Sequence, residues 1–164
     1  MGSSRKQDKR KNILNISVIC LVLIFLASLF FIFRKKTMFP KDLGLNIKGN
    51  SYYLEIAQTN QERKKGLSNR QEICSNCGML FIFNKEDQHS FWMKDTYVPL
   101  DIIWLNSKKE IVKIITAAKT DSETVYTNKT PAKYVIELPA NESLKLKLQI
   151  GETIPIFDNE QEFD

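Results

Sequence analysis

The sequence of 164 residues has few of the side chains that build metal and nucleophile sites: one histidine, His89, and three cysteines. Cys20 lies in an apolar run, so His89, Cys74 and Cys77 leave a tetrahedral zinc site one ligand short. The motifs G-x-S-x-G, G-x-x-x-x-G-K-[ST], H-E-x-x-H and G-x-G-x-x-G are also missing. These absences argue against the common hydrolases, nucleotide-binding proteins and metalloproteases, and we expect no metal and no cofactor.

Charge is missing from a long N-terminal segment, because no charged residue occurs in 13–33. A helix that rises about 1.5 Å per residue would carry this segment across the roughly 30 Å hydrocarbon core of a bilayer. The segment is longer than the apolar region of a signal peptide, and it runs into Phe30 and Phe31 where a cleavage site would need small residues. We therefore predict an uncleaved transmembrane helix at 13–33.

The excess positive charge flanks this segment. Five basic residues lie in 1–12 and three more at 34–36, whereas the rest of the chain is slightly acidic. The formal net charge of +5 therefore reflects membrane topology, and we expect no nucleic-acid partner. The larger number of basic residues before the helix predicts a cytoplasmic N-terminus, a single pass through the cell membrane and an extracytoplasmic domain.

The remaining chain divides by composition. We interpret 1–12 as a basic cytoplasmic segment and 34–49 as a juxtamembrane spacer, because breaks fall at Pro40, Gly44 and Gly49. The predicted domain covers 50–157, and an acidic tail follows at 158–164.

Within the domain, alternating or continuous apolar segments predict short strands. Thr59 and Glu62 form a capping-box pattern that predicts a helix ending before Gly66. The expected strands are 51–57, 78–83, 88–93, 100–105, 111–117, 134–138 and 154–157; the expected helices are 60–65 and 139–148; the expected turns are 84–87 and 106–110. With no visible βαβ alternation, this pattern predicts a β-rich α+β fold, a small antiparallel sandwich or half-open barrel with two short helices.

Cys74 and Cys77 form a C-x-x-C pair. Such a pair can be a redox dithiol, half of a metal site or a structural disulfide, and in an exported domain the oxidised form is the default. Redox catalysis normally places the pair at a helix N-terminus, whereas this segment leads from a loop into a strand. We therefore expect a local disulfide or solvent-facing thiols, and we expect His89 to be an exposed strand residue.

An ordered set of motifs carries a family resemblance. It comprises Gly66-Leu67, Arg70, GMLF at 78–81, FWMK-x-T at 91–96, PLD at 99–101 and A-x-Y-x-x-E-L at 132–138. In this order the motifs resemble the domain of unknown function 192 (DUF192) family, over about 52–156. The resemblance implies a compact β-rich fold but no particular reaction. The sequence departs from the usual pattern at Asp95, where asparagine is commoner, and at Cys74.

Polar residues at the expected strand ends suggest a ligand site. Trp92 and Lys94 share one face of their strand, which is an unusual pair to bury. We hypothesise a shallow pocket for an anionic, sugar-like or peptide ligand, in which the indole stacks and the cations pair with acidic groups. Its candidate residues are Arg70, Trp92, Lys94, Thr96, Asp101 and Glu137. The alternative is an aromatic core with ion pairs at its rim.

These features favour a membrane-anchored, extracytoplasmic binding or accessory module. The alternative is an enzyme, either a hydrolase that uses Asp101 or Glu137 with Lys94, or a thiol oxidoreductase that uses Cys74 and Cys77. A third possibility is a domain that docks to an envelope protein.

Overall fold

The structure is a computed structural model that describes residues 42–156. The predicted basic segment, transmembrane helix, first part of the spacer and acidic tail lie outside the described residues. Within 42–156, no helix has the length and apolarity that a membrane span requires.

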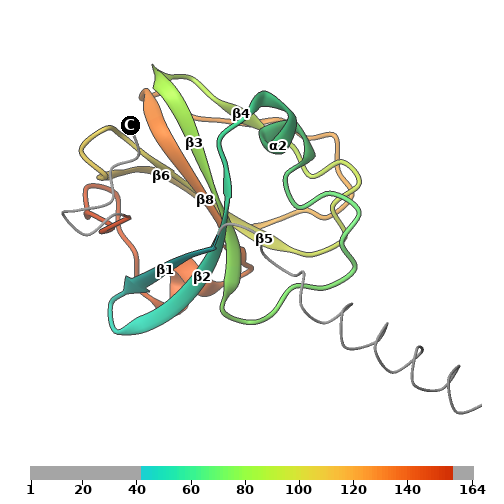
Figure 1. The fold of residues 1–164 in the computed structure, drawn as a ribbon, viewed down its shortest axis with the longest axis horizontal. Coiled ribbons are helices and arrows are strands. Elements are labelled where there is room, and N and C mark those ends of the chain that lie inside the picture. The colour runs from blue at the N-terminus through green and yellow to red at the C-terminus, as the bar shows by residue number, and fades with distance from the viewer. Residues whose placement is uncertain (1–41, 157–164) are drawn as a thin grey trace, which may run out of the picture. The chain divides into compact units, whose positions relative to one another are not determined.

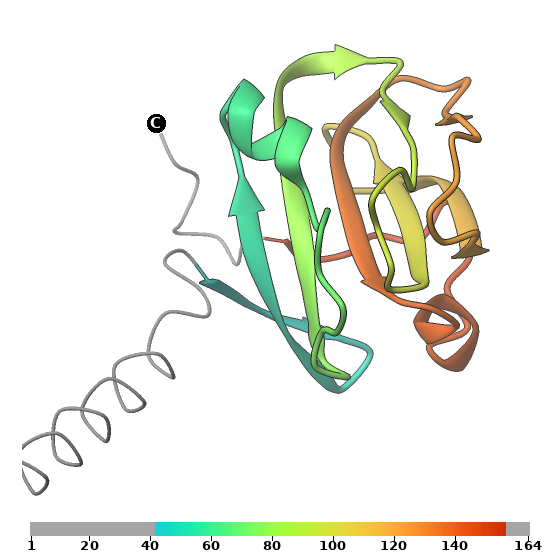
Figure 2. The same ribbon diagram turned by 90° about the vertical axis from the view of Figure 1, so that its right-hand side faces the viewer.

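The described chain folds around one mixed sheet with the strand order β1-β2-β3-β8-β5-β6. Its strands are β1 (Asp42–Ile47), β2 (Asn50–Ala57), β3 (Cys77–Asp87), β5 (Leu100–Leu105), β6 (Ile111–Ala118) and β8 (Ala132–Pro139). A two-stranded sheet joins β4 (Ser90–Phe91) to β7 (Tyr126–Thr127), and the helices are α2 (Asn60–Lys65) and α3 (Glu142–Lys145). Figures 1 and 2 show the strongly twisted sheet, with the two helices at separate places around it.

The predicted β-rich α+β class with two short helices is confirmed, but the expectation of a purely antiparallel sheet is wrong. β2 and β3 pair in parallel, with Leu54 opposite Gly78. Parallel neighbours need a crossover connection, and the segment that contains α2 supplies it. The remaining neighbours in the large sheet are antiparallel.

Both faces of the sheet are buried. In β8, Tyr134, Ile136 and Leu138 belong to one apolar cluster, which draws residues from all six strands of the large sheet. Val135 belongs to a second cluster, which lies on the opposite face with Met93 and the apolar groups around it. Because side chains alternate along a strand, Glu137 faces the same side as Val135. The fold therefore places a carboxyl group on an apolar face.

Gly78 explains how β3 and β8 approach each other at this point. A Cβ atom at Gly78 would lie 2.2 Å from the carbonyl oxygen of Glu137. Such an approach excludes any side chain larger than hydrogen, and it fixes the backbone of Glu137 against β3.

The α2 helix matches its prediction in full. The Thr59 hydroxyl accepts a hydrogen bond from the Glu62 backbone, the Glu62 carboxylate accepts one from the Thr59 backbone, and Gly66 ends the helix at φ +48°. Several other boundaries differ. The chain at 42–47 is strand β1 and not spacer; β3 continues through the predicted turn at 84–87; the strand expected at 88–93 shrinks to β4; and no strand forms at 154–156. Phe157 lies outside the described residues.

Candidate functional site

A cavity of about 310 Å³ opens beside α2, on the face of the sheet to which Glu137 points. Four parts of the chain surround it: α2 with the residues that follow it, strand β3, the segment around β4, and strand β8. Its lining is Arg63, Lys64, Lys65, Gly66, Leu67, Ser68, Phe81, Phe83, Gln88, His89, Ser90, Phe91, Trp92, Thr96 and Glu137. The cavity therefore combines aromatic walls, basic residues and one buried acid.

Glu137 is the buried acid of this cavity. It lies near the end of β8, between Met79 of β3 and Ile102 of β5, and is 5% exposed. Among residues 42–156, no group donates a hydrogen bond to its carboxyl. Burial raises the pKa of Glu137 to about 8, while the positive charge of Arg70 acts in the opposite direction. Near neutral pH the carboxyl of the free protein is therefore mostly protonated, and a cation placed beside it would favour its ionised form.

Aromatic rings form the walls. The ring of Phe91 meets Phe81 edge-on at 4.9 Å and Trp104 edge-on at 5.7 Å between centroids. The imidazole of His89 stacks on Phe83 at 3.5 Å, and its backbone carbonyl accepts a hydrogen bond from the Trp104 indole at 3.1 Å. Burial lowers the pKa of His89. This interlocking holds the β4 segment rigidly over the sheet.

Basic side chains surround the opening. Arg63 is fixed, because its guanidinium donates to the carbonyls of Gln58 and Ile82 and lies 5.0 Å above the Phe83 ring. Lys64 and Lys65 are exposed and form no ion pair with any described residue. Two lysine ammonium groups are therefore free to meet a ligand.

The cavity brings together three of the six predicted site residues: Trp92, Thr96 and Glu137. Trp92 is 53% exposed, whereas Thr96 is buried and donates its hydroxyl to the Lys94 carbonyl at 3.3 Å. Lys94 does not line the cavity; its ammonium lies 5.5 Å from the Trp92 ring and pairs with Glu123 at 3.1 Å. Arg70 is also outside the lining, because both of its terminal nitrogens bind the Glu55 carboxylate.

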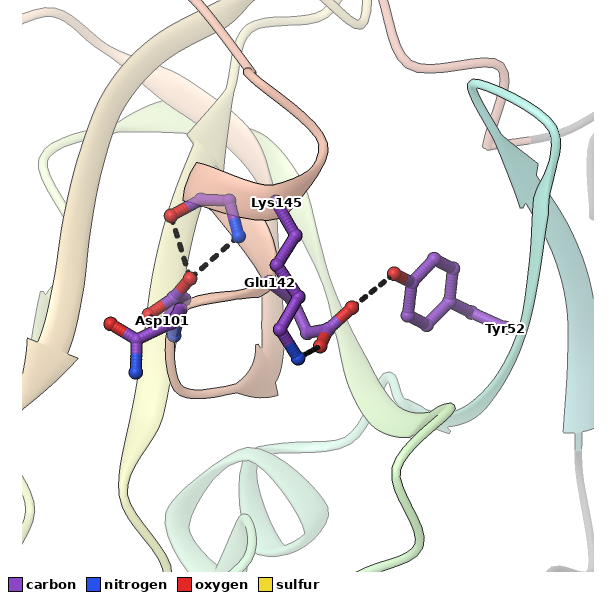
Figure 3. Close-up of polar contacts among 6 residues, drawn as sticks. Tyr52, Asp101, Glu142 and Lys145 are labelled. Atoms are coloured by element: carbon purple, nitrogen blue, oxygen red, sulfur yellow. Dashed lines mark hydrogen bonds and ion pairs between the residues drawn. The ribbon is translucent and has the colours of Figure 1, made fainter.

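Asp101 lies apart from the cavity, under α3 (Figure 3). Its Oδ1 accepts hydrogen bonds from the backbone of Ala117 at 2.8 Å and Asn141 at 2.9 Å. Its Oδ2 accepts from the Ser143 backbone at 2.7 Å and from the Ser143 hydroxyl at 2.6 Å. The carboxylate is fully buried and fully occupied, so it ties β5 to β6 and to α3. Close by, Tyr52 donates its hydroxyl to Glu142 at 2.5 Å.

A disulfide joins Cys74, in the connection before β3, to Cys77, the first residue of β3. Neither cysteine lines the cavity. Among residues 42–156, no three histidine, cysteine, aspartate or glutamate side chains gather in a way that could hold a metal ion.

Several lining residues were not predicted as site residues. His89, expected to be exposed, is half-buried against Phe83, and Lys64 and Lys65 line the same cavity. The capping box does place both lysines in the last turn of α2, but it says nothing of the β4 segment opposite.

The family model described as Uncharacterized ACR, DUF192, matches residues 44–156. The chain belongs to the DUF192 family. Two solved structures resemble this DUF192 protein. One, from Sinorhizobium meliloti 1021, is described with a proposed role as a transcription regulator; it shares 32% identity at a TM-score of 0.60 and covers 62% of this chain and 79% of its own. The other, from Novosphingobium aromaticivorans, is of unknown function; it shares 29% identity at a TM-score of 0.63, over 68% of this chain and 80% of its own. No curated protein matches the chain.

Proposed function

We propose that this DUF192 protein is a membrane-anchored, extracytoplasmic module that binds a small polar ligand in the cavity beside α2. The observation that carries the proposal is the Glu137 carboxyl, which lines the cavity, is almost fully buried and has no hydrogen-bond partner among the described residues. A buried polar group without a partner is costly, and a ligand that hydrogen-bonds to it relieves that cost. The volume suits a ligand at the small end of the range for binding sites.

The enzyme alternatives have less support. A hydrolase would need a second reactive group near Glu137, but Asp101 is occupied by four hydrogen bonds and Lys94 points to Glu123. A thiol oxidoreductase would need Cys74 or Cys77 at the cavity, which neither residue lines. The regulatory role proposed for the Sinorhizobium meliloti protein is not extended to this chain, because its excess basic charge flanks 13–33 and no basic face follows from the rest of the sequence.

Ligand binding is tested by thermal unfolding of the full-length protein in detergent against a panel of small anions, neutral and charged sugars, and short peptides. At least one class is expected to raise the unfolding temperature in proportion to the logarithm of its concentration. Ser68→Phe, which fills the cavity, is expected to abolish the shift, whereas Ser107→Phe on the exposed β5–β6 turn keeps it. A panel without any response, or an unchanged shift in Ser68→Phe, would contradict the proposal.

The anchor is tested separately, by adding protease to intact cells and to spheroplasts. The domain is expected to be cleaved by protease in spheroplasts, in which the cytoplasmic membrane is still closed. The reason is that the basic residues of 1–12 favour a cytoplasmic N-terminus. Reversing the bias, by replacing the five basic residues of 1–12 with glutamine, is expected to reduce this accessibility. Cleavage that requires cell lysis would refute the extracytoplasmic placement.

A further inference from the structure

We infer that the ligand of this cavity carries a protonated amine, which pairs with the Glu137 carboxylate, and an anionic group, which meets Lys64 and Lys65. The inference rests on the proposed function, since it assumes that the cavity is a binding site. It assigns the chemical class of the ligand, a small zwitterion whose two charges lie at opposite ends.

The first argument is the missing counter-charge at Glu137. Among the described residues, the one cation that acts on its carboxyl is Arg70, and the guanidinium of Arg70 is already bound to Glu55, with a distance of 2.8 Å between Nη2 and Oε2. On the neighbouring strands, Met79 and Ile102 are apolar. An ammonium group supplies both the positive charge and the hydrogen-bond donors that the described residues do not offer to Glu137. A charge-assisted hydrogen bond of this kind is roughly twice as strong as a neutral one. A neutral hydroxyl supplies only the hydrogen bond.

The second argument is the aromatic lining. The faces of aromatic rings attract cations, and Phe81, Phe91 and Trp92 line the cavity with Glu137. One of these rings already has a cation near it, because the ammonium of Lys94, a residue outside the lining, lies 5.5 Å from the centroid of Trp92. A carboxyl group among aromatic rings is the combination that recognises an ammonium group.

The third argument is the positive charge at α2. Arg63 is neutralised by no carboxylate among the described residues, and Lys64 and Lys65 are exposed beside it. A ligand with a single positive charge would be repelled by these three cations. An anionic group at its other end turns that repulsion into attraction, which explains why the ligand should be a zwitterion.

The experiment compares three probes of matched length, 4-aminobutyrate, 4-hydroxybutyrate and butylamine, by calorimetric titration of the full-length protein in detergent at pH 7. We expect 4-aminobutyrate to bind at least tenfold more tightly than either of the other two, because each of them lacks one charge. Glu137→Gln is expected to remove the preference for the amine over the hydroxyl, whereas Glu72→Gln, an exposed carboxylate outside the lining, keeps it. Lys64→Ala with Lys65→Ala is expected to weaken 4-aminobutyrate but not butylamine, which gives a second measure independent of Glu137.

Three results would overturn the inference. If 4-hydroxybutyrate binds as tightly as 4-aminobutyrate, the site does not select an amine, although the cavity still binds ligands. If a member of the wider panel binds and none of these probes does, the assigned class is wrong. If neither the panel nor the probes bind, the proposed function fails together with the inference.

Discussion

Replacement of Asp101 by asparagine is expected to lower the free energy of unfolding by about 2–4 kcal/mol. The carboxylate accepts four hydrogen bonds and donates none. In the asparagine variant one oxygen becomes an NH₂ group, which would face the Ser143 backbone N–H as a second donor. That N–H would be left buried without an acceptor.

The backbone around Asp101 adds to the expected loss. Two of the groups that it binds belong to residues with positive φ, Ala117 at 49° and Asn141 at 70°. Left-handed backbone is unfavourable for alanine in particular, so surrounding contacts must hold it in place. Ala117 also lies where the pairing of β5 with β6 shifts register. The Asp101 carboxylate therefore stabilises an irregular strand pair and the start of α3 at once.

The measurement is urea unfolding of the full-length protein in detergent, followed by the fluorescence of its two tryptophans. Asp95→Asn is the matched control, because Asp95 is exposed and has φ 54°, which asparagine tolerates. This substitution should change the free energy of unfolding by less than about 0.5 kcal/mol. If Asp101→Asn left stability unchanged but abolished ligand binding, Asp101 would be a ligand residue, as the sequence suggested.

The sequence did not predict that Asp101 and Glu137 lie apart. Both residues were placed at the ends of expected strands and assigned to one shared pocket. Whether the two carboxylates lie on the same face of the sheet depends on the register between β5 and β8. In this register Asp101 pairs with Leu138, and Glu137 pairs with Ile102. Residues directly opposite each other share a face, so this register sends the two carboxylates to opposite sides of the sheet. Nothing in either segment alone specifies it.

Helices and strands were likewise predicted correctly where local sequence signals decide them, and missed where the structure depends on contacts between distant segments. Local signals were sufficient for α2, where the capping box and Gly66 set both ends, and for β5 with the turn after it. β1 was missed although Leu43, Leu45 and Ile47 alternate along it, because Gly49 was interpreted as a break when it forms the turn to β2. The parallel pairing of β2 with β3 was missed because it depends on packing between distant segments. The continuous apolar run of β3, typical of a strand buried on both faces, was the available signal.

The stability of the protein is expected to fall as pH rises from about 4.5 to about 8, relative to a Glu137→Gln variant. In the unfolded chain Glu137 ionises near its ordinary pKa of 4.5, whereas in the folded protein burial raises its pKa to about 8. Between these values the folded state holds one proton more, so each pH unit removes up to about 1.4 kcal/mol of stability. Below pH 4.5 the group is protonated in both states and the effect is absent.

The difference between the wild type and Glu137→Gln isolates this group. The exposed carboxylates whose pKa values are lowered, Glu86 and Asp87, contribute equally to both proteins and cancel. The charged or titratable groups around Glu137, namely Arg70, His89 and the basic residues at 63–65, are also unchanged. Between pH 4.5 and pH 8.5, the free energy of unfolding of Glu137→Gln should rise by about 3–5 kcal/mol relative to that of the wild type, as measured by urea unfolding across that range. The free energy of unfolding of Glu72→Gln should show the same pH dependence as that of the wild type. A constant difference between wild type and Glu137→Gln would mean that Glu137 is ionised in the folded protein throughout, and that the cavity already presents a carboxylate.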